Sequence, residues 1–178
     1  MKEIRWHGRG GQGAFTASKI LGDAAVLDGK YALAFPSFGP ERRGAPVMAF
    51  TKVSDKRITD RSVIHKCDYI VFLDETLYDP AVSSDLKNGG KILINSHEPL
   101  KYKEDYITAV NADKISQKIL KRVVSNTAML GLLAAVSGTV DAENIKQALY
   151  EYFPQEIADN NKKVIEEVVY EAIHKKHV

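Results

Sequence analysis

The sequence predicts an α/β fold with a mostly parallel, Rossmann-like sheet flanked by helices and a helical C-terminal segment. Residues 69–73 (YIVFL) are continuously apolar, as is typical of a strand covered on both faces in a parallel sheet. Strand-like and helix-like segments alternate with short connections. From Ala112 onward the spacing of apolar residues is helical. We therefore expect a single domain over residues 1–178.

Six segments are expected to form strands because their apolar residues alternate or run continuously between turn-forming residues. They are residues 2–7, 31–35, 47–53, 69–73, 91–94 and 106–110. Ile4 and Trp6 give the first strand its alternation. Ser54-Asp55-Lys56 resembles a turn, so residues 57–61 are expected to pair with the preceding strand as a hairpin.

Helices are predicted where apolar residues recur at helical spacing. These segments are residues 14–28, 76–86, 112–123, 127–137, 141–151 and 158–175. Gly29 is a plausible stop for the first helix, and Asn88-Gly89-Gly90 is expected to end the second. The charged run from Asn161 to Lys176 alternates with apolar residues. It therefore predicts an amphipathic helix that packs on the domain or on a partner.

Composition and charge exclude several classes of function. Cys67 is the only cysteine, so the chain lacks the thiolates of an iron–sulfur cluster or a cysteine-built zinc site. We expect Cys67 to act as a small buried hydrophobe. A net charge of +2 does not indicate nucleic-acid binding. No apolar stretch approaches the roughly 20 residues of a membrane span, and the N-terminus lacks a signal-peptide pattern. A cytoplasmic protein without membrane contact is expected.

A glycine loop lies between the first predicted strand and the first predicted helix. Gly8-Arg9-Gly10-Gly11-Gln12-Gly13 satisfies G-x-G-x-x-G through Gly8, Gly10 and Gly13. Glycines let the backbone approach a ligand, and the free amides of the following helix favour an anion. Arg9 adds a fork-shaped cation that could hold a phosphate. The second strand lacks the terminal carboxylate of a dinucleotide site, which argues against NAD. A tight turn without any ligand remains the alternative.

A second loop, residues 35–46, carries three prolines and two glycines around Glu41, Arg42 and Arg43. Its restricted backbone predicts an ordered loop. Two arginines on such a loop can meet phosphates bidentately. Because the loop follows the second strand, it can share a sheet edge with the glycine loop. A subunit interface rich in arginine and aromatic residues ranks equally. A solvated face, with Glu41 paired to one arginine, ranks last.

Polar residues elsewhere have simpler interpretations. Ser125, Asn126 and Thr127 open an apolar helix, so N-capping is the leading explanation for them. Asp74 and Glu75 follow a buried strand, and a charge role at a helix N-terminus is expected. The five histidines lack metal-ligand spacing, so surface or structural roles are expected.

Five blocks, in order, resemble one known family. They are residues 6–13 with Thr16-Ala17, residues 38–46, Asp74-Glu75-Thr76, residues 126–131 (NTAMLG) and residues 153–156 (FPQE). The chain resembles the gamma subunit of pyruvate:ferredoxin oxidoreductase, in the 2-oxoacid:ferredoxin oxidoreductase family, over essentially its whole length. The match raises Asn126 and Thr127 to possible ligand or interface contacts.

The resemblance implies an enzyme that converts a 2-oxoacid and coenzyme A to an acyl-CoA, carbon dioxide and reduced ferredoxin. Thiamin diphosphate and iron–sulfur clusters would reside on alpha, beta and delta-type partner subunits, and ferredoxin would be reached indirectly. This chain would hold no cofactor and no catalytic residue alone, contributing to coenzyme A binding and assembly. Pyruvate is the expected substrate; related 2-oxoglutarate, 2-oxoisovalerate or indolepyruvate enzymes are alternatives. An independent nucleotide-binding regulatory module and a purely architectural subunit are further alternatives.

Overall fold

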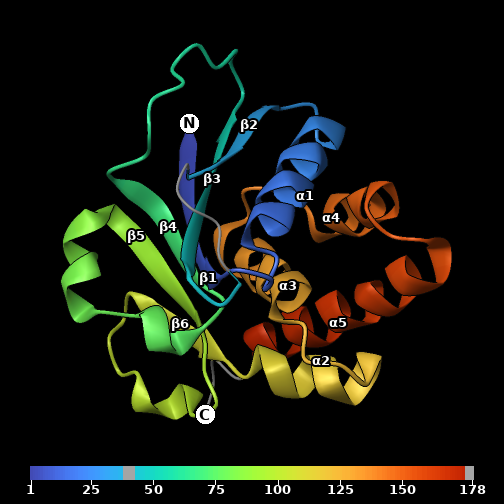
Figure 1. The fold of residues 1–178 in the computed structure, drawn as a ribbon. Coiled ribbons are helices and arrows are strands. Elements are labelled where there is room, and N and C mark those ends of the chain that lie inside the picture. The colour runs from blue at the N-terminus through green and yellow to red at the C-terminus, as the bar shows by residue number, and fades with distance from the viewer. Residues whose placement is uncertain (38–42, 175–178) are drawn as a thin grey trace.

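The fold is built on one six-stranded sheet with strand order β2-β3-β1-β4-β5-β6 (Figure 1). The structure is a computed structural model and describes residues 1–37 and 43–174. The strands are β1 (Lys2–Arg9), β2 (Tyr31–Pro36), β3 (Pro46–Ser54), β4 (Cys67–Phe72), β5 (Leu86–Asn95) and β6 (Ile107–Val110). Strands β1, β4, β5 and β6 pair in parallel, whereas β3 runs antiparallel to both β1 and β2. The predicted fold class is confirmed.

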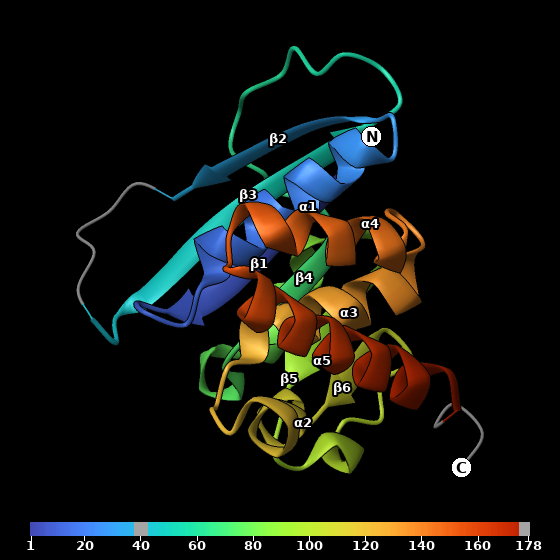
Figure 2. The same cartoon turned by 90° about the vertical axis from the view of Figure 1, so that its right-hand side faces the viewer.

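One face of the sheet is covered by the α-helices, which lie in front of the sheet in Figure 2. They are α1 (Ala14–Leu27), α2 (Ala112–Leu120), α3 (Ser125–Ser137), α4 (Ala142–Ala148) and α5 (Gln155–His174). Trp6, Val71 and Leu93 of the sheet are buried in one cluster with Ile20 and Leu133 of the helices. Within the described ranges, no single helix is long and apolar enough to cross a membrane. The α2–α3 pair has the length and composition together but is bent by 119°.

The opposite face is covered by shorter elements. Three 3₁₀-helices pack there together with the segment 55–66: η1 (Glu75–Leu77), η2 (Pro80–Asp85) and η3 (Pro99–Lys101). A fourth, η4 (Leu149–Glu151), follows α4 instead. Phe50, Ile70, Phe72 and Ile94 of the sheet are buried on this face with Ile64. The two faces therefore differ in the kind of element that covers them.

The prediction of a helix over residues 76–86 is wrong, because two 3₁₀-helices form there instead. Asp79 precedes Pro80 and is extended, with φ −124° and ψ 128°, as a residue before proline tends to be. The carboxylates of Asp74 and Asp79 each start a separate short turn, by accepting from Thr76 N and Ala81 N. The residues expected to end that helix, 88–90, instead lie within β5.

The prediction of a hairpin strand at residues 57–61 is also wrong. Both edges of β3 are already paired, one with β1 and the other with β2, so no free edge remains beside it. The fully buried ammonium group of Lys52 instead binds the Asp60 carboxylate at 2.6 Å. This ion pair holds the segment over the sheet face. The other predicted strands and helices are confirmed within a few residues of their expected bounds.

Two helical glycines should respond oppositely to alanine. A Cβ at Gly131 of α3 would lie 3.2 Å from Ile165 Cα of α5, whereas one at Gly22 of α1 would make an ordinary 3.6 Å contact with Ala34. Gly131→Ala should therefore destabilise the fold by about 1–3 kcal/mol through overpacking. Gly22→Ala should stabilise it by about 0.5–1 kcal/mol through helix propensity. Urea unfolding measures both, and equal effects would contradict the packing of α3 on α5.

Candidate functional site

The glycine loop leaves the carboxyl end of β1 and turns directly into α1. Gly11 and Gly13 have φ angles of 98° and 80°, in the left-handed region that glycine tolerates best. Gly13 is the N-cap of α1, and its carbonyl accepts the first helical bond from Ala17 N at 2.9 Å. No side chain caps this terminus. The amides of the first turn, residues 14–16, therefore have no intrahelical acceptor.

The second loop is joined to the glycine loop by backbone hydrogen bonds. Gly10 N donates to Ala45 O at 2.8 Å, and Gly44 N donates to Gly10 O at 3.1 Å. The predicted proximity of the two loops is therefore confirmed. Arg43 is exposed at the end of the second loop, and Arg42 lies outside the described residues.

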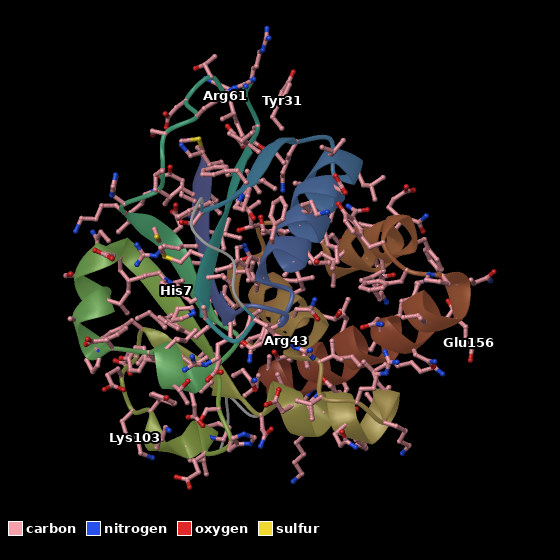
Figure 3. The ribbon with its side chains drawn as sticks, viewed as in Figure 1. His7, Tyr31, Arg43, Arg61, Lys103 and Glu156 are labelled. Carbon is pink, nitrogen blue, oxygen red and sulfur yellow. The ribbon has the colours of Figure 1, made fainter. Side chains whose placement is uncertain are left out.

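A cavity of about 640 Å³ lies between the two loops, within the size range of about 300–1,000 Å³ typical of small-molecule sites. The glycine loop and the first turn of α1 form one side, and the ends of β2 and β3 form another. Figure 3 shows Arg43 beside the start of α1, and Arg43 is part of the lining. Phe15, Val47 and Met48 add apolar surface. The cavity thus combines open amides, a cation and an apolar wall.

The Arg9 guanidinium is held by protein groups. Its Nε donates to Asp74 Oδ2 at 3.0 Å, its Nη1 to the Gly44 carbonyl at 3.2 Å and its Nη2 to Thr76 Oγ1 at 2.7 Å. Partial burial by itself would raise the pKa of Asp74. Hydrogen bonds from Thr76 and Gln12 and the charge of Arg9 nevertheless lower that pKa below its usual value. Asp74 therefore stays ionised beside Arg9.

Gln12 also folds back onto the protein. Its Oε1 accepts from Arg9 N at 2.6 Å, and its Nε2 donates to Asp74 Oδ2 at 3.2 Å. Gly8 is buried, and a Cβ there would lie 3.3 Å from Leu73 and 3.5 Å from Gln12 Oε1. Gly8 and Gln12 therefore shape the turn.

Asn126 and Thr127 lie in the first turn of α3, and both are buried. Val124, not one of the three predicted residues, is the N-cap of α3, although Asn126 Oδ1 accepts from the first-turn amide of Thr127 at 2.9 Å. Ser125 Oγ donates instead to Leu73 O at 3.3 Å. A Cβ at Gly13 would lie only 2.5 Å from Asn126 Nδ2. Asn126 therefore packs directly under the turn and requires glycine there.

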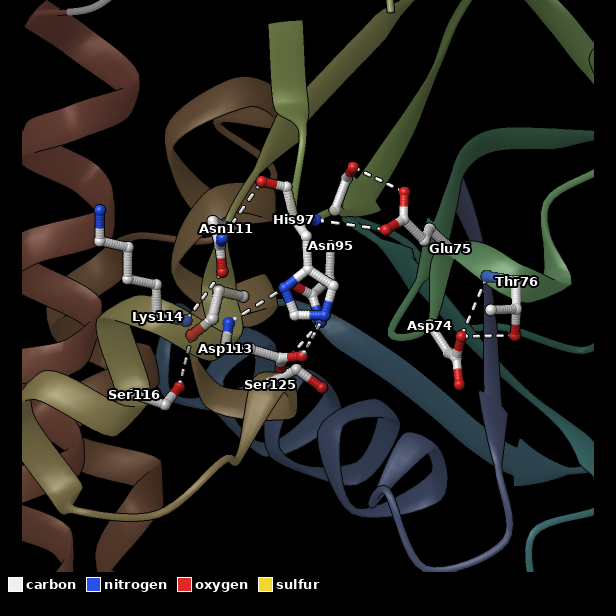
Figure 4. Close-up of polar contacts among 12 residues, drawn as sticks. Asp74, Glu75, Thr76, Asn95, His97, Asn111, Asp113, Lys114, Ser116 and Ser125 are labelled. Carbon is white, nitrogen blue, oxygen red and sulfur yellow. Dashed lines mark hydrogen bonds and ion pairs between the residues drawn. The ribbon is translucent and has the colours of Figure 1, made fainter. Parts of the chain in front are cut away.

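Asp74 and Glu75 follow β4, and Figure 4 shows Asp74 bound to Thr76 and Glu75 reaching the segment that follows β5. Asp74 caps η1 by accepting from Thr76 N at 3.0 Å, which confirms its expected role at a helix N-terminus. Glu75 accepts instead from Ser96 Oγ at 2.7 Å and from the Lys101 ammonium group. Burial alone would raise the pKa of Glu75, but these hydrogen bonds lower it to about 2. Both carboxylates therefore have structural partners.

His7, next to the glycine loop, has a partly buried side chain whose environment the sequence did not reveal. Its ring stacks on Phe72 with centroids 4.6 Å apart. Its Nε2 atom is buried and finds no hydrogen-bond partner in the described part of the chain. Burial first, and the positive charge of Arg5 second, lower the pKa of His7 to about 4. His7 is therefore neutral at physiological pH.

Residues 3–171 match the model of the pyruvate ferredoxin/flavodoxin oxidoreductase family. The chain belongs to this family. Among its relatives is the pyruvate/ketoisovalerate oxidoreductases common subunit gamma of Thermococcus litoralis, which is 44% identical across 96% of this chain and 100% of the relative. The pyruvate synthase subunit PorC of Methanocaldococcus jannaschii is also 44% identical, across 99% of each chain.

A solved structure supports the same assignment. The crystal structure of pyruvate oxidoreductase subunit PORC from Thermotoga maritima has a TM-score of 0.82 and 38% identity, covering 95% of each chain. The resemblance inferred from the sequence blocks is confirmed. The chain is thus a gamma-type subunit within the 2-oxoacid:ferredoxin oxidoreductases, which are multisubunit enzymes.

His7 should make the stability of this oxidoreductase subunit depend on pH. Its pKa is about 4 in the folded chain instead of 6.5, so the unfolded chain takes up the proton first. Folding stability is therefore lost as pH falls from about 6.5 towards 4. With ~1.4 kcal/mol per pKa unit, the loss from His7 between pH 7.5 and pH 4.5 should be about 2–3 kcal/mol.

Urea unfolding of His7→Phe at the two pH values measures this contribution, because phenylalanine keeps an aromatic ring beside Phe72 but does not titrate. His7→Gln should show the same reduced pH dependence, whatever its absolute stability. A wild-type pH dependence in both variants would show that His7 is not held neutral by burial.

Proposed function

We propose that the cavity between the glycine loop and the second loop receives the phosphate-bearing end of coenzyme A. The complex that contains this chain would convert pyruvate and coenzyme A to an acyl-CoA, carbon dioxide and reduced ferredoxin. The observation that carries the proposal is the combination of uncapped α1 amides and the Arg43 guanidinium in one cavity.

Charge supports a polyanionic ligand. Coenzyme A carries a diphosphate and a 3′-phosphate, and the N-terminal end of α1 offers both free amides and the positive end of the helix dipole. Arg43 can bind a phosphate bidentately. Arg42 is proposed as a second cation on the same loop. Gly10, Gly11 and Gly13 would bring the backbone close to the phosphates.

The apolar side of the cavity fits the rest of the ligand. Phe15 lines the cavity and is 37% exposed, so it could stack on the adenine ring. Val47 and Met48 would contact the uncharged chain. Gly8, Gln12, Asn126 and Thr127 would then act by shaping and supporting the turn beneath the ligand.

Cofactors and partners follow from the same proposal. Cys67 is fully buried, and burial raises the pKa of its thiol to about 11, which disfavours the thiolate needed for metal binding. Iron–sulfur clusters would therefore reside on alpha, beta and delta-type subunits in the cytoplasm, with ferredoxin reached through them. Thiamin diphosphate is proposed to reside on these partner subunits as well. The Thermococcus litoralis relative is named as common to pyruvate and ketoisovalerate oxidoreductases. That name favours selection of the 2-oxoacid on another subunit.

Arg43→Ala tests the proposal in the assembled complex. Loss of one charged phosphate contact should raise the apparent KM for coenzyme A by about tenfold, which corresponds to ~1.4 kcal/mol. The KM for pyruvate and the thiamin diphosphate content should not change.

Arg61→Ala is the matched control, because Arg61 is also an exposed arginine but lies on a different part of the molecule from Arg43 (Figure 3). An intact complex with unchanged coenzyme A kinetics in Arg43→Ala would exclude this cavity as the coenzyme A site.

A further inference from the structure

We propose that Arg9 is a positioning residue that fastens the second loop, and with it Arg43, against the glycine loop, while Asp74 holds Arg9 in place. This inference rests on the function proposed for the cavity, although the fastening itself can be measured without a ligand. Arg9 would thus bind protein groups, and Arg43 would bind the phosphates.

The contacts of Arg9 join three separate segments of the chain. The residue stands at the end of β1, its Nη1 reaches the Gly44 carbonyl at 3.2 Å, and its Nη2 reaches Thr76 Oγ1 at 2.7 Å. Gly44 directly follows Arg43 in the chain. Two backbone hydrogen bonds between Gly10 and residues 44 and 45 lie beside this contact. The position of Arg43 is therefore tied to the side chain of Arg9.

Asp74 is a firm anchor for this arrangement. It directly follows the buried Leu73, and its Oδ1 accepts from Thr76 N at 3.0 Å and from Thr76 Oγ1 at 2.6 Å. Its Oδ2 accepts from Arg9 Nε at 3.0 Å and from Gln12 Nε2 at 3.2 Å. The side chain of Asp74 is 19% exposed and that of Arg9 is 36% exposed. The carboxylate is therefore largely shielded from solvent, whereas the guanidinium remains partly exposed.

Arg9 also lines the cavity. Three of its five N–H donors are taken by Asp74, Gly44 and Thr76. Leaving Asp74 for a phosphate would strand that carboxylate without its cation near a polyanionic ligand, which like-charge repulsion disfavours. A positioning role keeps every one of these contacts.

In the assembled complex, Asp74→Asn separates the two roles by the direction in which it changes the KM for coenzyme A. If Arg9 positions the loop, weakening its anchor should raise the KM for coenzyme A by about tenfold. The kcat and the KM for pyruvate should remain unchanged. If Arg9 instead gripped the phosphates, the substitution would free Arg9 and remove a negative charge, so the KM would fall. A lower KM would overturn the inference.

Arg9→Lys gives a second measurement of the same role. Lysine keeps the charge but lacks the planar fork that reaches three acceptors. The positioning role therefore predicts that Arg9→Lys raises the KM for coenzyme A about as much as Arg9→Ala does. Nearly full rescue by lysine would show that only the charge matters, and would overturn the inference.

Trypsin cleavage of the full chain without ligand tests the fastening independently of coenzyme A. Cleavage after Arg43 should be faster in Arg9→Ala and Asp74→Asn than in the wild type. Cleavage after Arg57 and Arg61, in the segment over the opposite face, should be unchanged and serves as the internal control.

The two measurements distinguish failure of the inference from failure of the proposed function. Unchanged cleavage after Arg43 would overturn the fastening role of Arg9. Faster cleavage there with an unchanged KM for coenzyme A would support the fastening and would count against coenzyme A as the ligand of this cavity.

Discussion

The close approach of the β1–α1 turn to α3 is the constraint on which the site depends. Gly13 adopts a left-handed conformation, and the space that a Cβ would need is already filled by the Asn126 amide. The turn therefore lies directly on a helix that is buried in the core. Because the turn is seated there, the first amides of α1 face the cavity, and Gly10 meets the backbone of residues 44 and 45.

The two faces of the sheet are held by different forces. The helical face is a continuous apolar cluster, whose stability comes mainly from hydrophobic burial. The other face also uses charged groups. Lys52 binds Asp60 at 2.6 Å and lies 3.6 Å from Glu3, and Arg5 binds Asp85 at 2.7 Å. In these pairs the cation is buried and the Asp60 or Asp85 carboxylate is exposed. Removing the carboxylate is costly because a buried charge is left uncompensated. These pairs therefore secure the segment 55–66 and η2.

Polar contacts near the glycine loop are already formed in the chain without a ligand. Charged and polar side chains near the glycine loop bind each other before any ligand arrives, as the contacts of Arg9, Asp74 and Gln12 show. A preorganised site loses less conformational entropy on binding. On the proposed function, this chain would supply a preorganised binding site for coenzyme A, and the chemistry would take place on partner subunits.

Local patterns in the sequence were enough to predict the α/β class, most strand positions, the buried Cys67 and the meeting of the two loops. These features depend on residue spacings within one segment, or on the rule that parallel strands end at the same edge.

Partners from distant segments could not be predicted in this way. The contact of the Arg9 guanidinium with Asp74, 65 residues away, was not foreseen. Residues 57–61 were expected to pair with β3, whose edges β1 and β2 already occupy. Asn126 was expected as an N-cap, but Val124 holds that position, and the packing of the Asn126 amide under Gly13 was not foreseen. Such contacts depend on which segments become neighbours after folding, and local spacing does not encode that choice.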